Sequence, residues 1–243
     1  MDNNDIFSRA RLLFGEAGMK RLSESKVILF GVGGVGSWCA EALVRSGIVN
    51  LTIVDCDSVC ASNINRQLMA LHSTLGEPKV EALKARLLDI NPNANIIARQ
   101  EVFNTESAES FHLDSYDYII DAIDSLADKA LLILLATRTK AHLFSSMGAA
   151  LKLDPTRISI AEFWKVQGCP LARALRQRFK RKGEFPARKF KCVYSDELVT
   201  NKGELDEPDD NSGRTRVNGS LMHITSIFGA MLASLVLRSA TAD

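Results

Sequence analysis

A glycine-rich turn directly after a short apolar run is the feature that most constrains the fold of this chain. The run is KVILF at residues 26–30, and the turn is GVGGVG at residues 31–36. Such a run, rich in β-branched residues, is typical of a buried strand in a parallel sheet. Residues 35–46 then show helical spacing, and residues 51–54 predict a second strand that ends at Asp55. Together they predict one βαβ unit.

The rest of the chain continues this alternation. We expect helices near residues 78–90 and 126–139, and strands near 95–101, 116–123 and 141–146. Residues 156–163 favour an antiparallel strand, and the apolar run at 220–237 favours a closing helix. The pattern predicts an α/β fold: a Rossmann-like, doubly wound, mostly parallel sheet with helices on both faces and a C-terminal extension.

Composition narrows the class of protein. Hydrophobic residues make up 46% of the 243 residues, which is enough for a core. The net charge of +1 does not by itself indicate nucleic-acid binding. The five cysteines are odd in number and form no CxxC pair, so we expect neither a disulfide framework nor a structural zinc. A reducing compartment, the cytoplasm, is the simple interpretation.

Two segments bear on membranes and targeting. The N-terminal sequence MDNNDIFSRARLLF has early acids and no apolar core, so we do not expect a signal peptide. The apolar stretch 224–237 is interrupted by Ser226 and Ser234 and is shorter than the roughly 20 residues of a membrane span. We expect a buried helix there, with peripheral contact to a membrane left open.

The glycine turn also carries chemistry. Gly31, Gly33, Gly34 and Gly36 allow backbone N–H groups to approach a phosphate at the beginning of a helix. Asp55, 24 residues after Gly31, stands where a carboxylate accepts hydrogen bonds from a ribose. NAD and FAD enzymes share these features, so an NAD-binding redox or regulatory module remains an alternative.

Three further motifs favour a nucleoside triphosphate. They are SNINRQ at 62–67, GEPK at 76–79 and DAID at 121–124, and a doubly wound sheet brings them to one edge. A triphosphate needs Arg and Lys donors and a metal held by a carboxylate. Arg66 and Lys79 supply the cations, and Asp124 supplies the metal ligand.

These motifs, with VDCD at 54–57, resemble the adenylation domain of ubiquitin-activating-type enzymes over residues 6–165. That superfamily includes the adenylating enzymes of molybdopterin and thiamine biosynthesis. The resemblance implies ATP and Mg²⁺ as cofactors, with Asp55 on the ribose and Asp124 on Mg²⁺. It places Asn63, Arg66 and Lys79 on the phosphates. The same motifs add Asp57 and Gln67 to the nucleotide-binding residues.

The same resemblance concerns assembly and domain organisation. In this family an arginine near the N-terminus reaches the ATP of the partner subunit. Matching FSRARLLFG to the family gives that role to Arg9, with Arg11 as the alternative, and implies a homodimer. We expect one adenylating domain over residues 1–243, with a nucleotide-binding core at 1–165 and a substrate-side extension at 166–243.

Within the superfamily, the remainder is similar to the tRNA threonylcarbamoyladenosine dehydratases. The motifs are SSMGA at 145–149, KLDPT at 152–156, PLAR at 170–173 and VYSDE at 193–197. The resemblance implies ATP-dependent cyclisation of the threonylcarbamoyl group at tRNA position 37, with tRNA as the partner. An activator of a small ubiquitin-like or sulfur-carrier protein is the alternative. A sulfur-carrier-like or cysteine-desulfurase-type helper is left open.

Charge is unevenly distributed in the extension. Residues 165–191 contain ten Lys or Arg and one acid, whereas residues 195–210 contain seven acids and one Lys, typical of a mobile loop. The basic cluster fits RNA phosphates, although a solvated helix face is the alternative. The candidate RNA-binding residues are Arg173, Arg176, Arg178, Lys180, Arg181 and Lys182. Cys192 and Cys169 are the candidates for a thioester intermediate. We do not expect an obligatory thioester, because a nucleophile within the substrate itself suffices.

Overall fold

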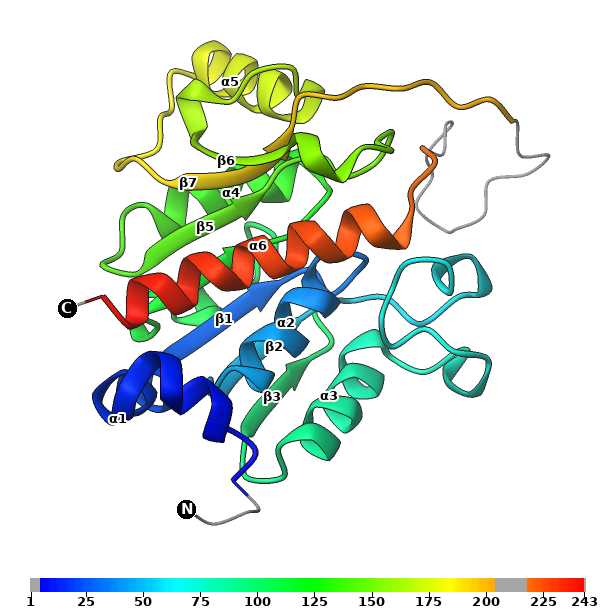
Figure 1. Ribbon diagram of the computed structural model, residues 1–243. Coiled ribbons are helices and arrows are strands. Elements are labelled where there is room, and N and C mark those ends of the chain that lie inside the picture. The colour runs from blue at the N-terminus through cyan, green and yellow to red at the C-terminus, as the bar shows by residue number, and fades with distance from the viewer. Residues whose placement is uncertain (1–4, 204–217, 243) are drawn as a thin grey trace.

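Strand β1 (Lys26–Phe30) lies inside a seven-stranded sheet of order β3-β2-β1-β4-β5-β7-β6 in the computed structural model (Figure 1). The structure describes residues 5–203 and 218–242. Neighbouring strands are parallel except for β6 and β7, which are antiparallel. The other strands are β2 (Asn50–Val54), β3 (Asn95–Arg99), β4 (Tyr118–Asp121), β5 (His142–Ser146), β6 (Ile158–Glu162) and β7 (Lys191–Ser195).

The strand order reverses direction at β1, which decides where a ligand binds. β1 pairs with β2 on one side and with β4 on the other, so Phe30 stands opposite both Val54 and Asp121. The loops that follow these three strands therefore meet at one edge. In open α/β sheets the ligand crevice lies beyond the carboxyl ends of the strands at such a switch point. The expected doubly wound α/β fold is confirmed.

Helices cover both faces of the sheet. The α-helices of the described residues are α1 (Ser8–Glu24), α2 (Gly36–Arg45), α3 (Lys79–Ile90), α4 (Leu126–Ala136), α5 (Pro170–Lys182) and α6 (Met222–Ala240). One core cluster joins the sheet to α1, α2, α3 and α6, and the other joins it to α4 and α5 (Figure 1). Aromatic rings fill part of the second cluster, where Phe30, Phe103 and Phe111 contact one another edge-on or tilted.

Helix α6 is a core helix, as its apolar sequence predicts. It is long and apolar enough to cross a membrane, but Ile224, Phe228, Leu232 and Val236 are fully buried. It packs along α2, and a side chain at Gly229 would come within 2.5 Å of the Val35 carbonyl oxygen. The missing side chain therefore permits the close approach of the two helices.

Three elements were not expected from the sequence: α1, α5 and β7. α1 bends at Gly15, whose φ of 66° is outside the helical range. β7 lies between β5 and β6, so the segment after residue 165 contributes a strand to the sheet and α6 to the core. Two residues of β7 are completely buried: Val193 belongs to one core cluster, and Cys192 belongs to the other. Their burial between the helix layers stabilises β7 inside the sheet. Residues 204–210 of the acidic segment lie outside the described residues.

Candidate nucleotide-binding site

The glycine turn between β1 and α2 is packed too closely for side chains. Gly31 has a φ of +84°, and a Cβ there would lie 2.6 Å from the Ala122 carbonyl oxygen. A Cβ at Gly36 would lie 1.8 Å from the carbonyl oxygen of Gly31. Only glycine fits this conformation and these contacts. The turn therefore brings its backbone close to the loop after β4 and begins helix α2 directly.

Asp55 connects the glycine turn to the loop after β2. Its Oδ2 accepts a hydrogen bond from the Val32 N–H at 2.8 Å, and its Oδ1 accepts one from the Asp57 N–H at 3.0 Å. Burial raises the pKa of Asp55 above its ordinary value, and the positive charge of Lys79 offsets part of this effect. A carboxylate has further lone pairs, so Asp55 retains capacity to accept ribose hydroxyls.

Lys79 begins helix α3 and points back to the same loop. Its Nζ lies 2.7 Å from Asp57 Oδ2, and its backbone N–H donates to the Asp57 carbonyl at 2.9 Å. The lysine side chain is only 7% exposed, whereas that of Asp57 is 62% exposed. A buried cation at a helix N-terminus that faces one exposed carboxylate is well placed to receive a phosphate.

The segment 62–67 covers the glycine turn. The Arg66 side chain passes within 3.3 Å of the Cβ position of Gly34, and its Nη1 donates to Ser62 and Asn65. The Gln67 amide nitrogen lies 3.7 Å from the Cβ position of Gly33. Gln67 Oε1 is buried and has no hydrogen-bond partner. Such an acceptor calls for a ligand or water, because buried polar atoms are nearly always paired.

Asn63 has a structural contact in this turn. Its buried side chain accepts a hydrogen bond from the Cys60 N–H at 3.2 Å and donates to Ser62. This contact fixes the short 3-10 helix Ala61–Asn63, which directly precedes the turn that carries Arg66 and Gln67.

The loop after β4 rests on a buried ion pair that sequence reasoning missed. Lys129 Nζ lies 2.9 Å from Asp121 Oδ2, and both side chains are completely buried. Lys129 also donates to the Ile123 carbonyl at 2.9 Å, and Ser145 donates to Asp121 at 2.6 Å. The available signal was a single lysine in the apolar helix LADKALLILLA. This pair fixes the loop that presents Asp124.

Asp124 is exposed at the end of this loop, two residues after the Ala122 that touches Gly31. A hard cation such as Mg²⁺ prefers oxygen ligands and usually shares them with substrate phosphates. An exposed carboxylate that follows the loop in contact with the glycine turn fits that requirement. Asp55, Cys56 and Asp57 also place their ligand atoms within 4.8 Å of one another on the neighbouring loop.

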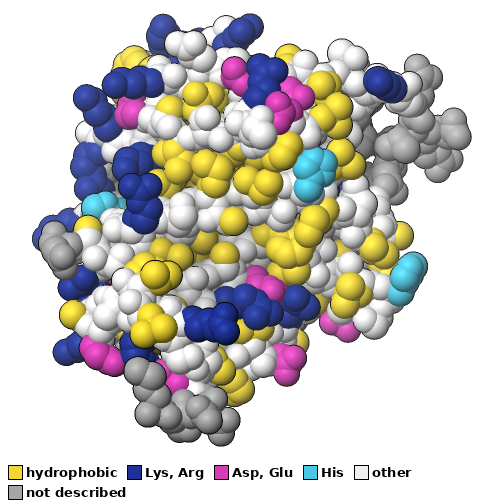
Figure 2. Space-filling model, in the orientation of Figure 1, with side chains coloured by type: hydrophobic (Ala, Val, Ile, Leu, Met, Phe, Trp, Pro, Cys, Tyr) yellow, Lys and Arg dark blue, Asp and Glu magenta, His cyan; other side chains and the backbone are white. Residues whose placement is uncertain are grey.

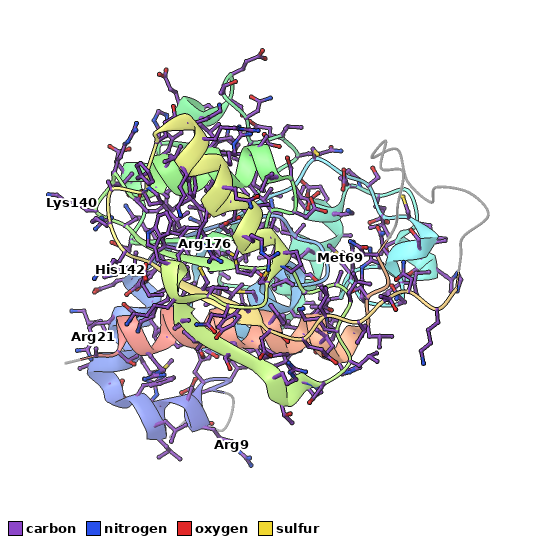
Figure 3. All side chains as sticks on the ribbon, turned by 90° about the horizontal axis from the view of Figure 1, so that it is seen from above. Arg9, Arg21, Met69, Lys140, His142 and Arg176 are labelled. Carbon is purple, nitrogen blue, oxygen red and sulfur yellow. The ribbon has the colours of Figure 1, made fainter. Side chains whose placement is uncertain are left out.

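The two N-terminal arginines differ in their surroundings. Arg11 pairs with Asp5 at 3.0 Å and with Glu16 at 2.5 Å. Arg9 is exposed on α1 and points away from the body of its own chain, far from the segment around Met69 (Figure 3). The structure therefore does not bring Arg9 to the glycine turn of the same chain.

The candidate RNA-binding residues lie on α5. Arg173, Lys180, Arg181 and Lys182 are exposed. Arg176 donates to the Phe163 carbonyl at 3.1 Å and lies over the Phe163 ring, so part of its charge is used within the fold. The basic last turn of α5 is also favoured by the helix dipole.

The two cysteines considered for a thioester are both buried. Cys192 is fully buried on β7, and burial raises its pKa well above the ordinary value of a thiol. Cys169 is 3% exposed at the start of α5. A nucleophilic thiolate needs the opposite surroundings, a lowered pKa and access.

Comparison with known proteins defines the class of this chain. Residues 7–243 match the model of the ThiF family, so the chain belongs to that family. A tRNA threonylcarbamoyladenosine dehydratase of Bacillus subtilis is 43% identical over 191 residues, covering 79% of this chain and 74% of the relative. The dehydratase of Haemophilus influenzae is 34% identical over 232 residues, covering 93% and 89%.

A solved structure agrees in fold. The Escherichia coli tRNA N6-threonylcarbamoyladenosine dehydratase in complex with ATP has a TM-score of 0.84 and 32% identity, covering 96% of this chain and 93% of that one. The same enzyme in complex with AMP has a TM-score of 0.83. The similarity extends through the region after residue 165, beyond the glycine turn that many nucleotide-binding proteins share.

Proposed function

We propose that this chain is an ATP-dependent dehydratase that cyclises N6-threonylcarbamoyladenosine at position 37 of tRNA. The candidate nucleotide-binding site at the glycine turn is the observation that carries the proposal. The chain that holds this site is similar to such dehydratases over nearly its whole length. Arg66 passes over the glycine turn, and Asp124 follows the loop that touches Gly31. Lys79 pairs with Asp57 on the loop after β2, which also ends at the switch point of the sheet. This set suits a triphosphate better than the dinucleotide of a redox module.

The chemistry follows from the groups present. The carboxylate of the threonylcarbamoyl group attacks the α-phosphorus of ATP and releases pyrophosphate, giving an acyl-adenylate. The carbamoyl group of the same side chain then attacks the activated carbonyl and expels AMP, which carries away the carboxylate oxygen. The net change is loss of one water from the nucleoside. The second step needs no external nucleophile, because both groups belong to one molecule.

The residues have separate tasks in this proposal. Backbone N–H groups of the glycine turn and the cations Arg66 and Lys79 hold the phosphates, and Asp55 accepts the ribose hydroxyls. Lys79 exchanges the exposed Asp57 carboxylate for a phosphate oxygen. Mg²⁺, held by Asp124, would neutralise phosphate charge. We also propose a homodimer in which Arg9 reaches the partner's site, and a cytoplasmic location, which the five free thiols support.

The direct test uses tRNA that carries threonylcarbamoyladenosine at position 37. Incubation with the enzyme and ATP should reduce the nucleoside mass by one water, with AMP and pyrophosphate formed in equal amounts. Lys79→Met is the matched inactive control. An unchanged nucleoside mass, together with pyrophosphate exchange stimulated by a peptide ending in Gly-Gly, would identify an activator of a carrier protein instead.

A further inference from the structure

A basic pocket lies at the edge of the sheet opposite the glycine turn. It has a volume of about 450 Å³ between the beginning of β5 and β7 and the end of α6. Its lining includes His142, Phe144, Phe190, Lys191, Leu235 and Arg238. Arg188 and Lys189 also line it, and no Asp or Glu does so among the described residues.

The pocket is far from the nucleotide-binding turn. Thr225, near the beginning of α6, touches the Cβ position of Gly34 at 3.2 Å, whereas Arg238 lies thirteen residues further along the same helix. With a rise of ~1.5 Å per residue, about 20 Å separates the two positions. Figure 3 shows Lys140 and His142 on one side of the molecule and Met69 on the other. One ATP molecule therefore does not occupy both places.

The cations of the pocket differ in their availability. Arg188 is engaged with the backbone, since it donates to the carbonyls of Thr137, Thr139 and Ala141 and so fixes the loop before β7. Lys189, Lys191 and Arg238 are exposed and make no ion pair with the described part of the chain. Three exposed cations without carboxylate partners in that part of the chain favour binding of a polyanion.

Aromatic groups accompany these charges. The exposed His142 ring stacks on Tyr118 with centroids 5.6 Å apart, and Phe144 stacks on the same tyrosine at 6.4 Å. Proteins that bind single-stranded RNA combine aromatic rings, on which bases stack, with a basic surface that follows the phosphates. A pocket that served only a small anion would not need an exposed stacked ring.

Figure 2 places this pocket in a larger basic surface. Lys and Arg side chains gather along the side where the ends of α5 and α6 lie, and they continue from the pocket toward α5. Lys180, Arg181 and Lys182 form the last turn of α5, a short loop before Lys189 and Lys191. The surface is therefore continuous with the helix whose charges indicated RNA.

We propose that this pocket is a second RNA subsite, which holds a phosphate-bearing, unpaired segment of the tRNA away from the reacting nucleoside. Lys191 and Arg238 would bind the phosphates, and His142 would stack with a base. The proposal rests on the proposed function, because tRNA is the substrate there. The pocket would then contribute part of the affinity for tRNA from a surface about 20 Å away from the glycine turn.

The test measures tRNA binding as a function of salt for Lys191→Gln and Arg238→Gln, with Lys84→Gln on α3 as the control for one lost charge. Each pocket variant should reduce the slope of log affinity against log salt by about one, and the double variant by about two. KM for tRNA should rise while kcat and ATP binding stay unchanged. Slopes equal to that of Lys84→Gln would overturn the proposal.

His142 tests the stacking part separately. His142→Ala should weaken tRNA binding on the order of tenfold with no change in salt slope, and His142→Tyr should restore it. No effect of His142→Ala would overturn the stacking role. The two hypotheses fail differently: a wild-type enzyme that does not dehydrate the tRNA refutes the proposed function. If the wild-type enzyme dehydrates the tRNA and the pocket variants bind tRNA as tightly as wild type, only the subsite is refuted. An acidic protein partner would then be the candidate ligand of the pocket.

Discussion

Lys129 Nζ lies 2.9 Å from Asp121 Oδ2 in a place where neither side chain reaches solvent. Ser145 and the backbone N–H of Ile123 also donate to Asp121, and Lys129 donates to the Ile123 carbonyl. The charges are thus paired and hydrogen-bonded, as burial requires. The pair connects β4, α4 and β5 beneath the loop that carries Asp124.

Removal of one partner of this pair should destabilise the fold strongly. We expect Lys129→Met to lower the free energy of unfolding by about 3–5 kcal/mol, because Asp121 is left as an uncompensated buried charge. Lys20→Met, on the exposed side of α1, should change it by no more than about 0.5 kcal/mol. Urea unfolding measures both. Equal effects would show that the buried pair contributes no more than a surface lysine.

Asp124→Asn should abolish most Mg²⁺-dependent turnover without unfolding the protein, because the Asp124 side chain is exposed and the replacement has nearly the same size. We expect a loss of about a hundredfold or more in kcat. Asp114→Asn removes an exposed carboxylate near the opposite edge and should leave turnover unchanged. If Asp124→Asn turned over tRNA at the normal rate, Asp124 would have no part in the site.

The position of Arg9 can be tested by mixing two inactive variants. Arg9→Ala and Lys79→Ala protomers should each lack activity, and their mixture should regain part of it. The reason is that one site of the heterodimer then has both an intact Lys79 and an intact Arg9 from the partner. Heterodimers should be verified by differently tagged chains. Verified heterodimers without any regained activity would contradict donation of Arg9 across the interface.

Cys192→Ala and Cys169→Ala should retain turnover, since both thiols are buried and the pKa of Cys192 is raised well above its ordinary value. Activity is measured at a temperature where circular dichroism shows each variant to be folded. A thioester mechanism would instead require that one folded variant loses turnover and that the wild-type enzyme yields a covalent adduct on that cysteine.

Asp55 should give stability a characteristic pH dependence. Burial raises its pKa above 3.8, so its contribution to stability is complete below that ordinary value and is lost as pH rises through the raised one. The stability of Asp55→Asn relative to wild type should therefore increase as the pH rises from 3.8 through the raised pKa of Asp55. Urea unfolding of both proteins at several pH values measures this. A constant difference would mean that Asp55 titrates alike in the folded and unfolded chains.

The sequence by itself determined the framework of the site. The KVILF run and the glycines set β1, the turn and α2, because period, length and conformational freedom are local properties. The positions of Asp55 and of segment 62–67 followed from the rule that parallel strands end at one edge. The resemblance to known adenylating enzymes, also present in the sequence, gave the function that we propose.

Only the tertiary structure decided which distant residues contact one another. The pairing of Lys129 with Asp121 joins two elements, and the apolar helix around the lysine gave no sign of the partner. Likewise the pocket beside His142 and Arg238 brings together residues separated by almost one hundred positions. Strand β7 was missed for the same reason. Its burial results from layers contributed by distant segments, and a local pattern does not contain the contacts that only the folded chain makes.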